Sequence, residues 1–294
     1  MLGAHLSARY CVVDGAMMAR DEIGVFQKPA EIYDPRGRLD PAGFERHVRF
    51  STTAPVEPLK PFVEHFWVIR WDVAEGTYHS AEVMHRPYVD VFLALDQSGI
   101  QGTFRGKRVY PASGSGRIIG ARFRPGAFHA FWSGELSNLQ DQILPLDRVF
   151  LGLDQARIEH LLAGSDEEAL AALSDLLLSL DPQPDENIAL VNAIIAAIEA
   201  DEALTTVSAV AGAFVRSERW LQQLFRDYLG IGLKWFLQRR RLLAAAELIR
   251  ASDAPDWIGI AYDLGYSSQQ HFITDFRQVL GETPLQYRAG LTRG

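Results

Sequence analysis

The stretch Ile260-Ala261-Tyr262-Asp263-Leu264-Gly265-Tyr266-Ser267-Ser268-Gln269-Gln270-His271-Phe272 decides the fold of the C-terminal part of this chain. A short apolar segment ends at Gly265, and a longer segment follows in which the apolar residues Phe272 and Phe276 recur four residues apart. Residues four apart lie on one face of a helix. A short helix, a turn and a longer helix make a helix-turn-helix unit.

The same pattern occurs once earlier in the chain. Val207-x-x-Val210-Ala211 corresponds to Trp257-x-x-Ile260-Ala261, fifty residues later, and Ser217-x3-Leu221-x3-Phe225-x4-Gly230 corresponds to Ser268-x3-Phe272-x3-Phe276-x4-Gly281, fifty-one residues later. The slip of one residue falls in the turn, where an insertion costs least. We therefore expect an all-α C-terminal domain with two helix-turn-helix units.

The rest of that domain also reads as helix. Residues 188–200 form an amphipathic pattern, and residues 233–250 form one long helix that joins the two units. The predicted domain covers residues 188–294.

Two such units suit the major groove of DNA, which admits one helix while the shorter helix braces it across the backbone. The outer face of each longer helix offers side chains that can bond base edges or phosphates. We predict that the DNA-binding residues are Arg216, Ser217, Arg219, Gln222, Gln223 and Arg226 in the first unit, and Ser268, Gln269, Gln270, Thr274 and Arg277 in the second.

Charge is distributed unevenly between the two units, although the whole chain carries a net charge of −8. Residues 216–250 contain eight basic and three acidic residues, whereas residues 251–294 contain three basic and five acidic residues. A polyanion should therefore bind the first unit more strongly than the second. The basic run Arg239 to Arg241 fits either phosphate contact or a solvated helix face.

Residues 205–288 resemble the DNA-binding domain of AraC/XylS-type transcription regulators. The resemblance rests on the stretch quoted above, on Gly281-x-Thr283-Pro284-x2-Tyr287-Arg288 after it, and on Arg241-x3-Ala245-x2-Leu248-Ile249 in the connecting helix. It implies sequence-specific binding of double-stranded promoter DNA, RNA polymerase as a partner, and control by a small-molecule effector or by homodimerisation.

Four positions depart from that pattern. Val215 stands where the second unit has Gly265, and Leu233 stands where the second unit has Pro284. Thr274 replaces a common arginine, and Asp275 adds a negative charge beside it. These departures favour the first unit as the stronger base reader.

The N-terminal region predicts an α+β sensor domain over residues 51–180. Residues 62–73, 88–95 and 117–124 are β-branched and aromatic runs typical of an antiparallel sheet. Residues 154–163 and 166–180 predict a helical hairpin, with a capping box formed by Ser165 and Glu168. Residues 1–50 stay poorly defined, and translation that starts at Met17 or Met18 is one reading of this segment.

A linker at residues 181–187, Asp181-Pro182-Gln183-Pro184-Asp185-Glu186-Asn187, separates the two predicted domains, because two prolines cannot continue a helix. The N-terminal region resembles a sensor domain of some of these regulators in three segments: 62–67, 120–126 and 146–147. Its aromatic residues could line a ligand pocket, with Arg122 or Arg124 as an anchor for an anionic group. Strand alternation places both arginines on one face, which favours their exposure to solvent.

An alternative is a β-barrel enzyme that binds a metal or a ligand and is fused to a DNA-binding domain. His79, Glu82, His85 and Asp90 could be metal ligands, but the spacing of the two histidines matches no known metal motif. Cys11 is the single cysteine, and the chain contains no Gly-rich phosphate loop. We therefore expect no enzyme activity, no metal and no cofactor.

No stretch approaches the roughly 20 apolar residues that a membrane helix needs, and the N-terminus lacks the pattern of a secretion signal. We expect a cytoplasmic protein that has no membrane partner.

Overall fold

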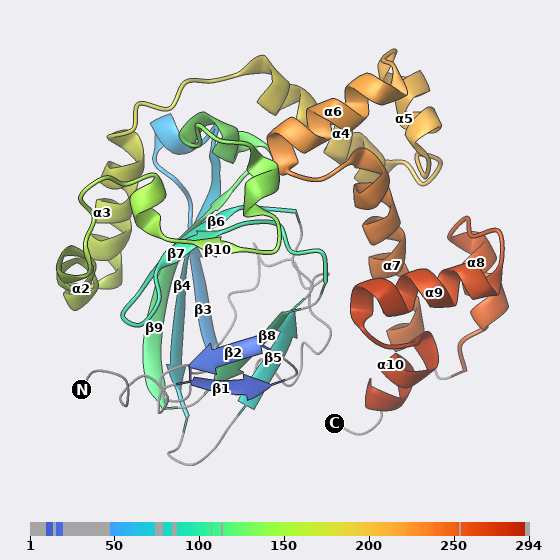
Figure 1. Ribbon diagram of the computed structural model, residues 1–294, viewed down its shortest axis with the longest axis horizontal. Helices are drawn as coiled ribbons and strands as arrows, with labels where there is room; N and C mark the ends of the chain where they lie inside the picture. Colours follow the sequence, from blue (N-terminus) through green and yellow to red (C-terminus); the bar gives the residue numbers. More distant parts are fainter. Residues whose placement is uncertain are drawn as a thin grey trace.

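The computed structural model describes residues 10–13, 16–19, 48–73, 79–83, 87–106, 108–112, 114–252 and 254–291. A β-rich N-terminal part is followed by a helical C-terminal part, in which the second helix-turn-helix unit lies farthest from the helical hairpin α2 (Gln155–Ala163) and α3 (Asp166–Leu178) (Figure 1). The expected fold class, α+β followed by all-α, is confirmed.

A six-stranded antiparallel sheet forms the frame of the N-terminal part. Its strands, in spatial order, are β10 (Ile143–Leu144), β7 (Gly99–Gln101), β6 (Asp90–Ala94), β9 (Ser115–Phe123), β4 (Val63–Asp72) and β3 (Val48–Thr53). Two separate pairs join β1 (Tyr10–Val13) to β2 (Ala16–Ala19) and β5 (His79–Val83) to β8 (Arg108–Ala112). The three predicted strands are confirmed as β4, β6 and β9.

The sheet has two different faces, because successive side chains of a strand point to opposite sides. One face, which we call the helix-covered face, carries buried apolar residues such as Phe66, Ala121 and Val91, which are cross-strand neighbours. It is packed against the predicted hairpin, α2 (Gln155–Ala163) and α3 (Asp166–Leu178). The second face carries His65, Arg122 and Asp90, and we call it the polar face.

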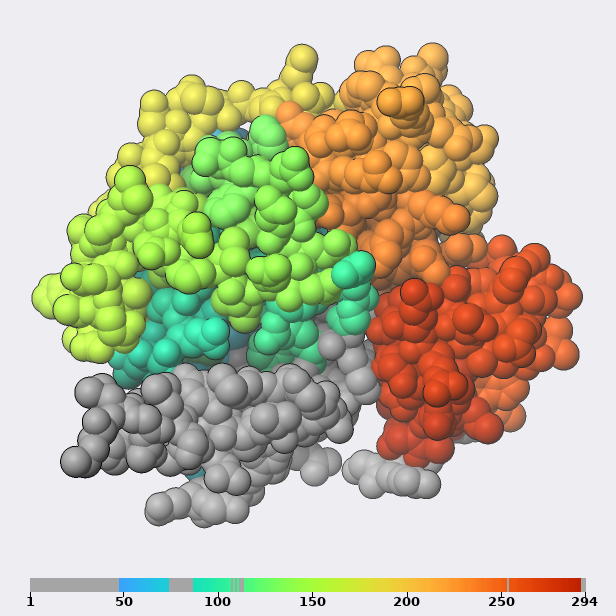
Figure 2. Space-filling model, in the orientation of Figure 1, coloured from blue at the N-terminus to red at the C-terminus, as the bar shows by residue number. Residues whose placement is uncertain are grey.

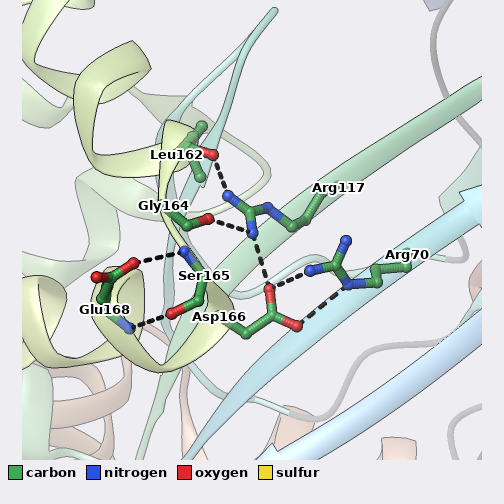
Figure 3. A network of polar contacts seen from close by, with 7 residues as sticks. All are labelled: Arg70, Arg117, Leu162, Gly164, Ser165, Asp166 and Glu168. Atoms are coloured by element: carbon green, nitrogen blue, oxygen red, sulfur yellow. Dashed lines mark hydrogen bonds and ion pairs between the residues drawn. The ribbon is translucent and has the colours of Figure 1, made fainter.

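One carboxylate fixes the hairpin to the sheet (Figure 3). Arg70 and Arg117 are cross-strand partners on β4 and β9, and both bind Asp166, the first residue of α3, at 2.6 Å and 2.9 Å. Arg117 also donates to the carbonyl oxygens of Leu162 and Gly164 at the end of α2. These bonds satisfy carbonyls that a helix end leaves without a partner.

The predicted capping box lies in the same network. Ser165 Oγ accepts from the backbone N–H of Glu168 at 3.2 Å, and the Glu168 carboxylate accepts from the backbone N–H of Ser165 at 2.8 Å (Figure 3). The backbone N–H of Ser165 lowers the pKa of the Glu168 carboxyl below its usual range, and the Ser165 hydroxyl lowers it further. The capping box predicted from the sequence is confirmed.

Seven helices follow in the described C-terminal part. They are α4 (Glu186–Ala200), α5 (Val207–Phe214), α6 (Glu218–Leu229), α7 (Leu233–Ala251), α8 (Trp257–Asp263), α9 (Gln269–Leu280) and α10 (Pro284–Leu291). The two predicted units are α5–α6 and α8–α9, and α7 is the predicted connecting helix.

The helix α10 was not predicted. Pro284 opens it, Gln286 N–H donates to Thr283 Oγ1, and Thr283 N–H donates to Gln286 Oε1 in return. This is the capping box pattern Thr-x-x-Gln, with proline at the first helical position. Leu233, fifty-one residues before Pro284, is the first residue of α7, so the repeat extends to a third helix, although Gly232 before it provides no side-chain cap.

Two hydrophobic cores divide the helical part, and their boundary lies within α7. The first core is continuous from the helix-covered face of the sheet through α4, α5 and α6 to Leu237. The second core begins at Leu242 and includes α8, α9 and α10. Packing thus runs across the proposed linker at residues 181–187, and the domain boundaries given above stay predictions. No helix in the described ranges is both long and apolar enough to cross a membrane.

Candidate nucleic-acid interface

The two units have matching local geometry. Each longer helix is capped at its N-terminus by a serine, since Ser217 Oγ accepts from Trp220 N–H and Ser268 Oγ accepts from His271 N–H, both at 3.2 Å. Each ends at a glycine with a left-handed backbone, Gly230 (φ 72°) and Gly281 (φ 81°). The repeat found in the sequence is therefore a repeat of hydrogen bonds and backbone angles.

The turns of the two units also match. Arg216 N–H donates to Ala211 O at 3.1 Å in the first turn, and Tyr266 N–H donates to Ala261 O at 2.9 Å in the second. These bonds close each short helix. Both acceptors are alanines, Ala211 and Ala261, and of the two only Ala261 is fully buried.

Each turn needs one residue in the left-handed region. Gly265 has φ 75°, and Val215, at the same place in the first unit, has φ 51°. A β-branched residue is strained in this conformation. The side chain of Val215 is 83% exposed, so no packing compensates the strain. The departure noted at Val215 is thus a real structural cost.

The inner faces of both longer helices are apolar, as predicted. Leu221 and Phe225 on α6, and Phe272 and Phe276 on α9, have no exposed surface. Burial of this stripe fixes which face of each helix remains outside.

The outer face of α6 is polar and accessible. The predicted residues Arg216, Ser217, Arg219, Gln223 and Arg226 are exposed, whereas Gln222 is half-buried. A side chain added at Gly232 would come within 2.7 Å of Gln222 Oε1, so this amide lies close to the start of α7. Gln223 Nε2 donates to Asp227 Oδ1 at 2.7 Å, and the Arg216 guanidinium lies 5.3 Å from the centre of the Trp220 ring.

The outer face of α9 is polar and less charged. Among its predicted residues, Gln270, Thr274 and Arg277 are exposed, while Ser268 and Gln269 are half-buried. Thr274 Oγ1 donates to Gln270 O at 2.9 Å, so its hydroxyl proton is already engaged. Asp275 is half-buried near Tyr266; burial raises the pKa of this tyrosine and Asp275 raises it further. The structure thus brings the predicted residues onto two helix faces, and their contact with DNA stays a prediction.

Two of the three basic residues at 239–241 serve the packing of α7. Arg239 is only 2% exposed, with its guanidinium 5.4 Å from the Trp235 ring centre, so the reading as a solvated face or as a phosphate contact is wrong for it. Arg241 lies 4.6 Å from the Tyr266 ring centre and donates to Gly265 O at 3.4 Å. It therefore joins α7 to the second turn, a role that the sequence analysis missed.

The first unit is also docked on the N-terminal part. The helix α6 contacts two short 3-10 helices, η3 (Ala127–Phe131) and η4 (Leu136–Leu139), and Figure 2 shows this orange segment lying directly against the green one. His129 on η3 stacks on Tyr228 near the end of α6, with ring centres 4.4 Å apart. A side chain added at Gly230 would come within 2.5 Å of Leu136 O.

Hydrogen bonds complete this junction. The Tyr228 hydroxyl donates to the carboxylate of Asp185, just before α4, and accepts from Asn187 Nδ2 at 3.0 Å. Asn192 Nδ2 donates to Pro125 O at 2.7 Å, and Thr103 Oγ1 donates to Leu229 O at 3.4 Å. Sequence patterns did not reveal this junction, because its members are far apart in the chain.

The metal reading of the N-terminal part finds no geometric support in the described residues, where no three His, Cys, Asp or Glu side chains gather in a metal-binding group. Asp90 instead pairs with Arg122. His79 and Glu82 lie on β5, but their side chains, and the whole of His85, fall outside the described residues. The expected solvent exposure holds for Arg124, whereas Arg122 is partly buried and held by Asp90.

Comparison with known protein families gives two matches. A family described as "Helix-turn-helix domain" matches residues 210–290, which span both units. A "Domain of unknown function (DUF6597)" matches residues 51–145, which hold most of the sheet.

Individual relatives match mainly the helical part. The regulatory protein SoxS of Escherichia coli is 42% identical over 72 residues, which are 24% of this chain and 66% of SoxS. The transcriptional activator RhaS of Escherichia fergusonii is 33% identical over 145 residues, which are 46% of this chain and 51% of RhaS. A solved AraC-type regulator structure from Chromobacterium violaceum is 27% identical and covers 34% of this chain and 89% of its own, with a TM-score of 0.31.

These matches cover limited parts of both partners. The chain spans 30%, 24% and 51% of the first three curated relatives, all of them regulators. The likeness is therefore strongest for the two helix-turn-helix units.

Proposed function

We propose, on the premise that the C-terminal part of this chain belongs to the AraC-type family of helix-turn-helix domains, that the whole chain is a sequence-specific transcription regulator. The observation that carries the proposal is the paired geometry of α6 and α9. Both helices are serine-capped, apolar inside and polar outside.

Each of these helices is suited to the major groove. Arginine can hold guanine at two points and glutamine can hold adenine at two points, and the exposed faces offer both residue types. We infer that the two helices read successive major-groove segments about one helical turn (roughly 10 bp) apart on one face of the duplex. Arg219, Gln223 and Arg226 on the basic first unit supply most of the affinity.

The N-terminal part controls that binding. Its η3 and η4 helices hold the end of α6, so a change in this part that displaces η4 also displaces the first recognition helix. A small molecule or a second copy of the chain that binds the N-terminal part is therefore linked to DNA affinity, and the linkage is reciprocal.

The remaining partners follow from this role. At a promoter, the bound protein recruits or blocks RNA polymerase, and it acts without enzymatic chemistry of its own. No observation in the described part of the chain favours a second function over this one.

The test uses the full chain and a library of random-sequence duplexes. Repeated selection should enrich one sequence, and titration of that labelled duplex should give saturable binding that weakens as salt rises. Arg219→Ala should weaken binding, whereas Arg157→Ala, which removes another exposed arginine, on α2, should leave it unchanged. Failure to enrich any sequence, or equal effects of the two variants, would refute the proposal.

A further inference from the structure

A row of polar residues crosses four adjacent strands on the polar face of the sheet. Gln101 on β7 lies opposite Asp90 on β6, Asp90 lies opposite Arg122 on β9, and Arg122 lies opposite His65 on β4. Gln101, Asp90 and His65 are buried, with exposed fractions of 7%, 4% and 5%. Four polar side chains in register on four strands, three of them buried, are unusual, because burial of a polar group requires compensation.

The charged part of this row is compensated internally. Arg122 Nε and Nη2 donate to the two carboxylate oxygens of Asp90 at 3.0 Å and 2.8 Å, which is the two-point geometry of a strong ion pair. Burial alone would lower the pKa of Arg122, but Asp90 outweighs burial and raises it. Tyr110 OH donates to Gln101 Oε1 at 3.1 Å. The row therefore presents no free charge.

The remaining polar atoms on this face have no such compensation. His65 Nδ1, His65 Nε2 and Trp67 Nε1 are buried and have no hydrogen-bond partner within the part of the chain that the structure describes, and the same holds for Trp71 Nε1 farther along the strand. Burial lowers the pKa of His65 to about 4, and the positive charge of Arg122 lowers it as well. The ring is thus neutral near pH 7, with one N–H donor and one acceptor nitrogen.

The backbone accommodates the indole of Trp67. Gly120 is its cross-strand partner, and a side chain at Gly120 would come within 2.3 Å of the ring. Any residue other than glycine would displace the indole. Gly120 on β9 thus leaves room for the indole of Trp67 on β4. This ring lies two residues from His65, about 7 Å along the strand.

We propose that His65 and Trp67, on the polar face of the sheet, bind a small uncharged organic molecule that offers hydrogen-bond acceptors such as carbonyl oxygens. This inference rests on the proposed function, in which such a molecule is the effector. Two N–H donors and one acceptor nitrogen await partners there, and native proteins rarely leave buried polar atoms unpaired. Arg122, considered above as an anchor for an anion, is already neutralised by Asp90, so its own charge is not available to an anionic ligand.

The test uses three probes of similar size and different charge: benzamide, benzoate and benzylamine. The full chain, labelled with ¹⁵N at tryptophan, reports each indole N–H separately, and Trp67→Phe assigns the signal of Trp67. Benzamide should shift the Trp67 signal saturably, and the charged probes should bind about tenfold or more weakly, because an unpaired charge is costly to bury. An unmoved Trp67 signal, or equal binding of benzoate, would overturn the inference.

Two variants separate this site from general packing. His65→Phe should abolish the benzamide response, since it removes both nitrogen atoms and retains a flat ring. Trp71→Phe is the matched control, because Trp71 lies over Gly116 on the same face but packs in a separate cluster with Val48 and Val73. In the Trp71→Phe variant, benzamide should still shift the Trp67 signal. Equal loss of the response in both variants would contradict the assignment.

A stability measurement covers the case in which His65→Phe perturbs the fold. If the His65 nitrogens await a ligand, the variant without probe should unfold at an equal or higher urea concentration than the wild type, because no bond is lost. A clearly lower midpoint would show that His65 is a structural residue and would overturn the inference. Duplex binding by the wild-type chain without any probe decides the proposed function separately.

Discussion

Val215 and Gly265 occupy the same position in the turns of the two units, and both have a left-handed backbone, with φ of 51° and 75°. A non-glycine residue in this region costs about 1–2 kcal/mol. The first unit therefore carries a strain that the second unit avoids, while both turns keep the same hydrogen bond to the small residue of the short helix.

We predict that Val215→Gly stabilises the protein. Relief of the strain should exceed the entropy cost of glycine, about 0.5–1 kcal/mol, and leave a net gain of up to about 1.5 kcal/mol in the free energy of unfolding. Urea denaturation of the full chain measures this change in the free energy of unfolding. The reverse exchange, Gly265→Val, should destabilise the protein, and a loss of stability in Val215→Gly would contradict the strain.

The junction between α6 and the N-terminal part predicts an unusually sensitive glycine. Gly230→Ala should cost more than about 2 kcal/mol, because it adds the left-handed penalty to a clash with the backbone of Leu136. Gly265→Ala is the matched control, since its φ is similar and a methyl group there meets nothing within 4 Å. Equal destabilisation of the two variants by urea would show that the junction is loose in solution.

The buried histidine of the sheet predicts a pH dependence of stability. The pKa of His65 is about 4 in the folded chain and 6.5 in the unfolded chain, so protonation favours unfolding. Above pH 6.5 the ring is neutral in both states, and the free energy of unfolding is not reduced by this titration. As the pH falls from 6.5 toward 4, the unfolded chain binds a proton at His65 that the folded chain does not, and the free energy of unfolding decreases. At pH 5 this loss is about 2 kcal/mol.

His65→Phe removes this titration and gives the control. The difference in unfolding free energy between pH 7 and pH 5 should be about 2 kcal/mol smaller in the variant than in the wild type, with both measured in urea. An identical pH dependence of the two proteins would mean that His65 is accessible to protons in the folded state.

The two recognition helices predict unequal contributions to DNA binding. Arg219→Ala should cost about 1–3 kcal/mol and relax preference at one or two base pairs, because arginine contributes both charge and two-point contact with guanine. Gln270→Ala should cost less, since the second unit carries more acidic than basic residues. Titration of the selected duplex at several salt concentrations gives both values. A larger loss for Gln270→Ala would identify α9 as the main reader.

Sequence periodicity predicted most helices and the repeat, because both depend on residues close together in the chain. Phe272 and Phe276 at helical spacing, and the Ser165–Glu168 capping box, are signals of this local kind. The Thr283–Gln286 capping box is equally local and was overlooked, so α10 could have been predicted.

Contacts between distant segments could not be predicted in this way. The burial of Arg239 depends on how α7 packs, and the stacking of His129 on Tyr228 joins residues almost a hundred positions apart. The pairing of Arg122 with Asp90 depends on strand order, which periodicity does not determine. The sequence showed that the N-terminal part is rich in aromatic residues. Only the register of the strands in the six-stranded sheet showed which polar side chains lie together on the polar face.

The central claim is that α6 and α9 both read DNA, in successive major grooves of one duplex. A hydroxyl-radical footprint of the full chain on its selected duplex tests it most directly. We predict two protected windows on one face of the duplex, about one helical turn (roughly 10 bp) apart, with the window assigned to α6 weakened by Arg219→Ala. A single protected window, or no protection at low salt, would contradict the claim.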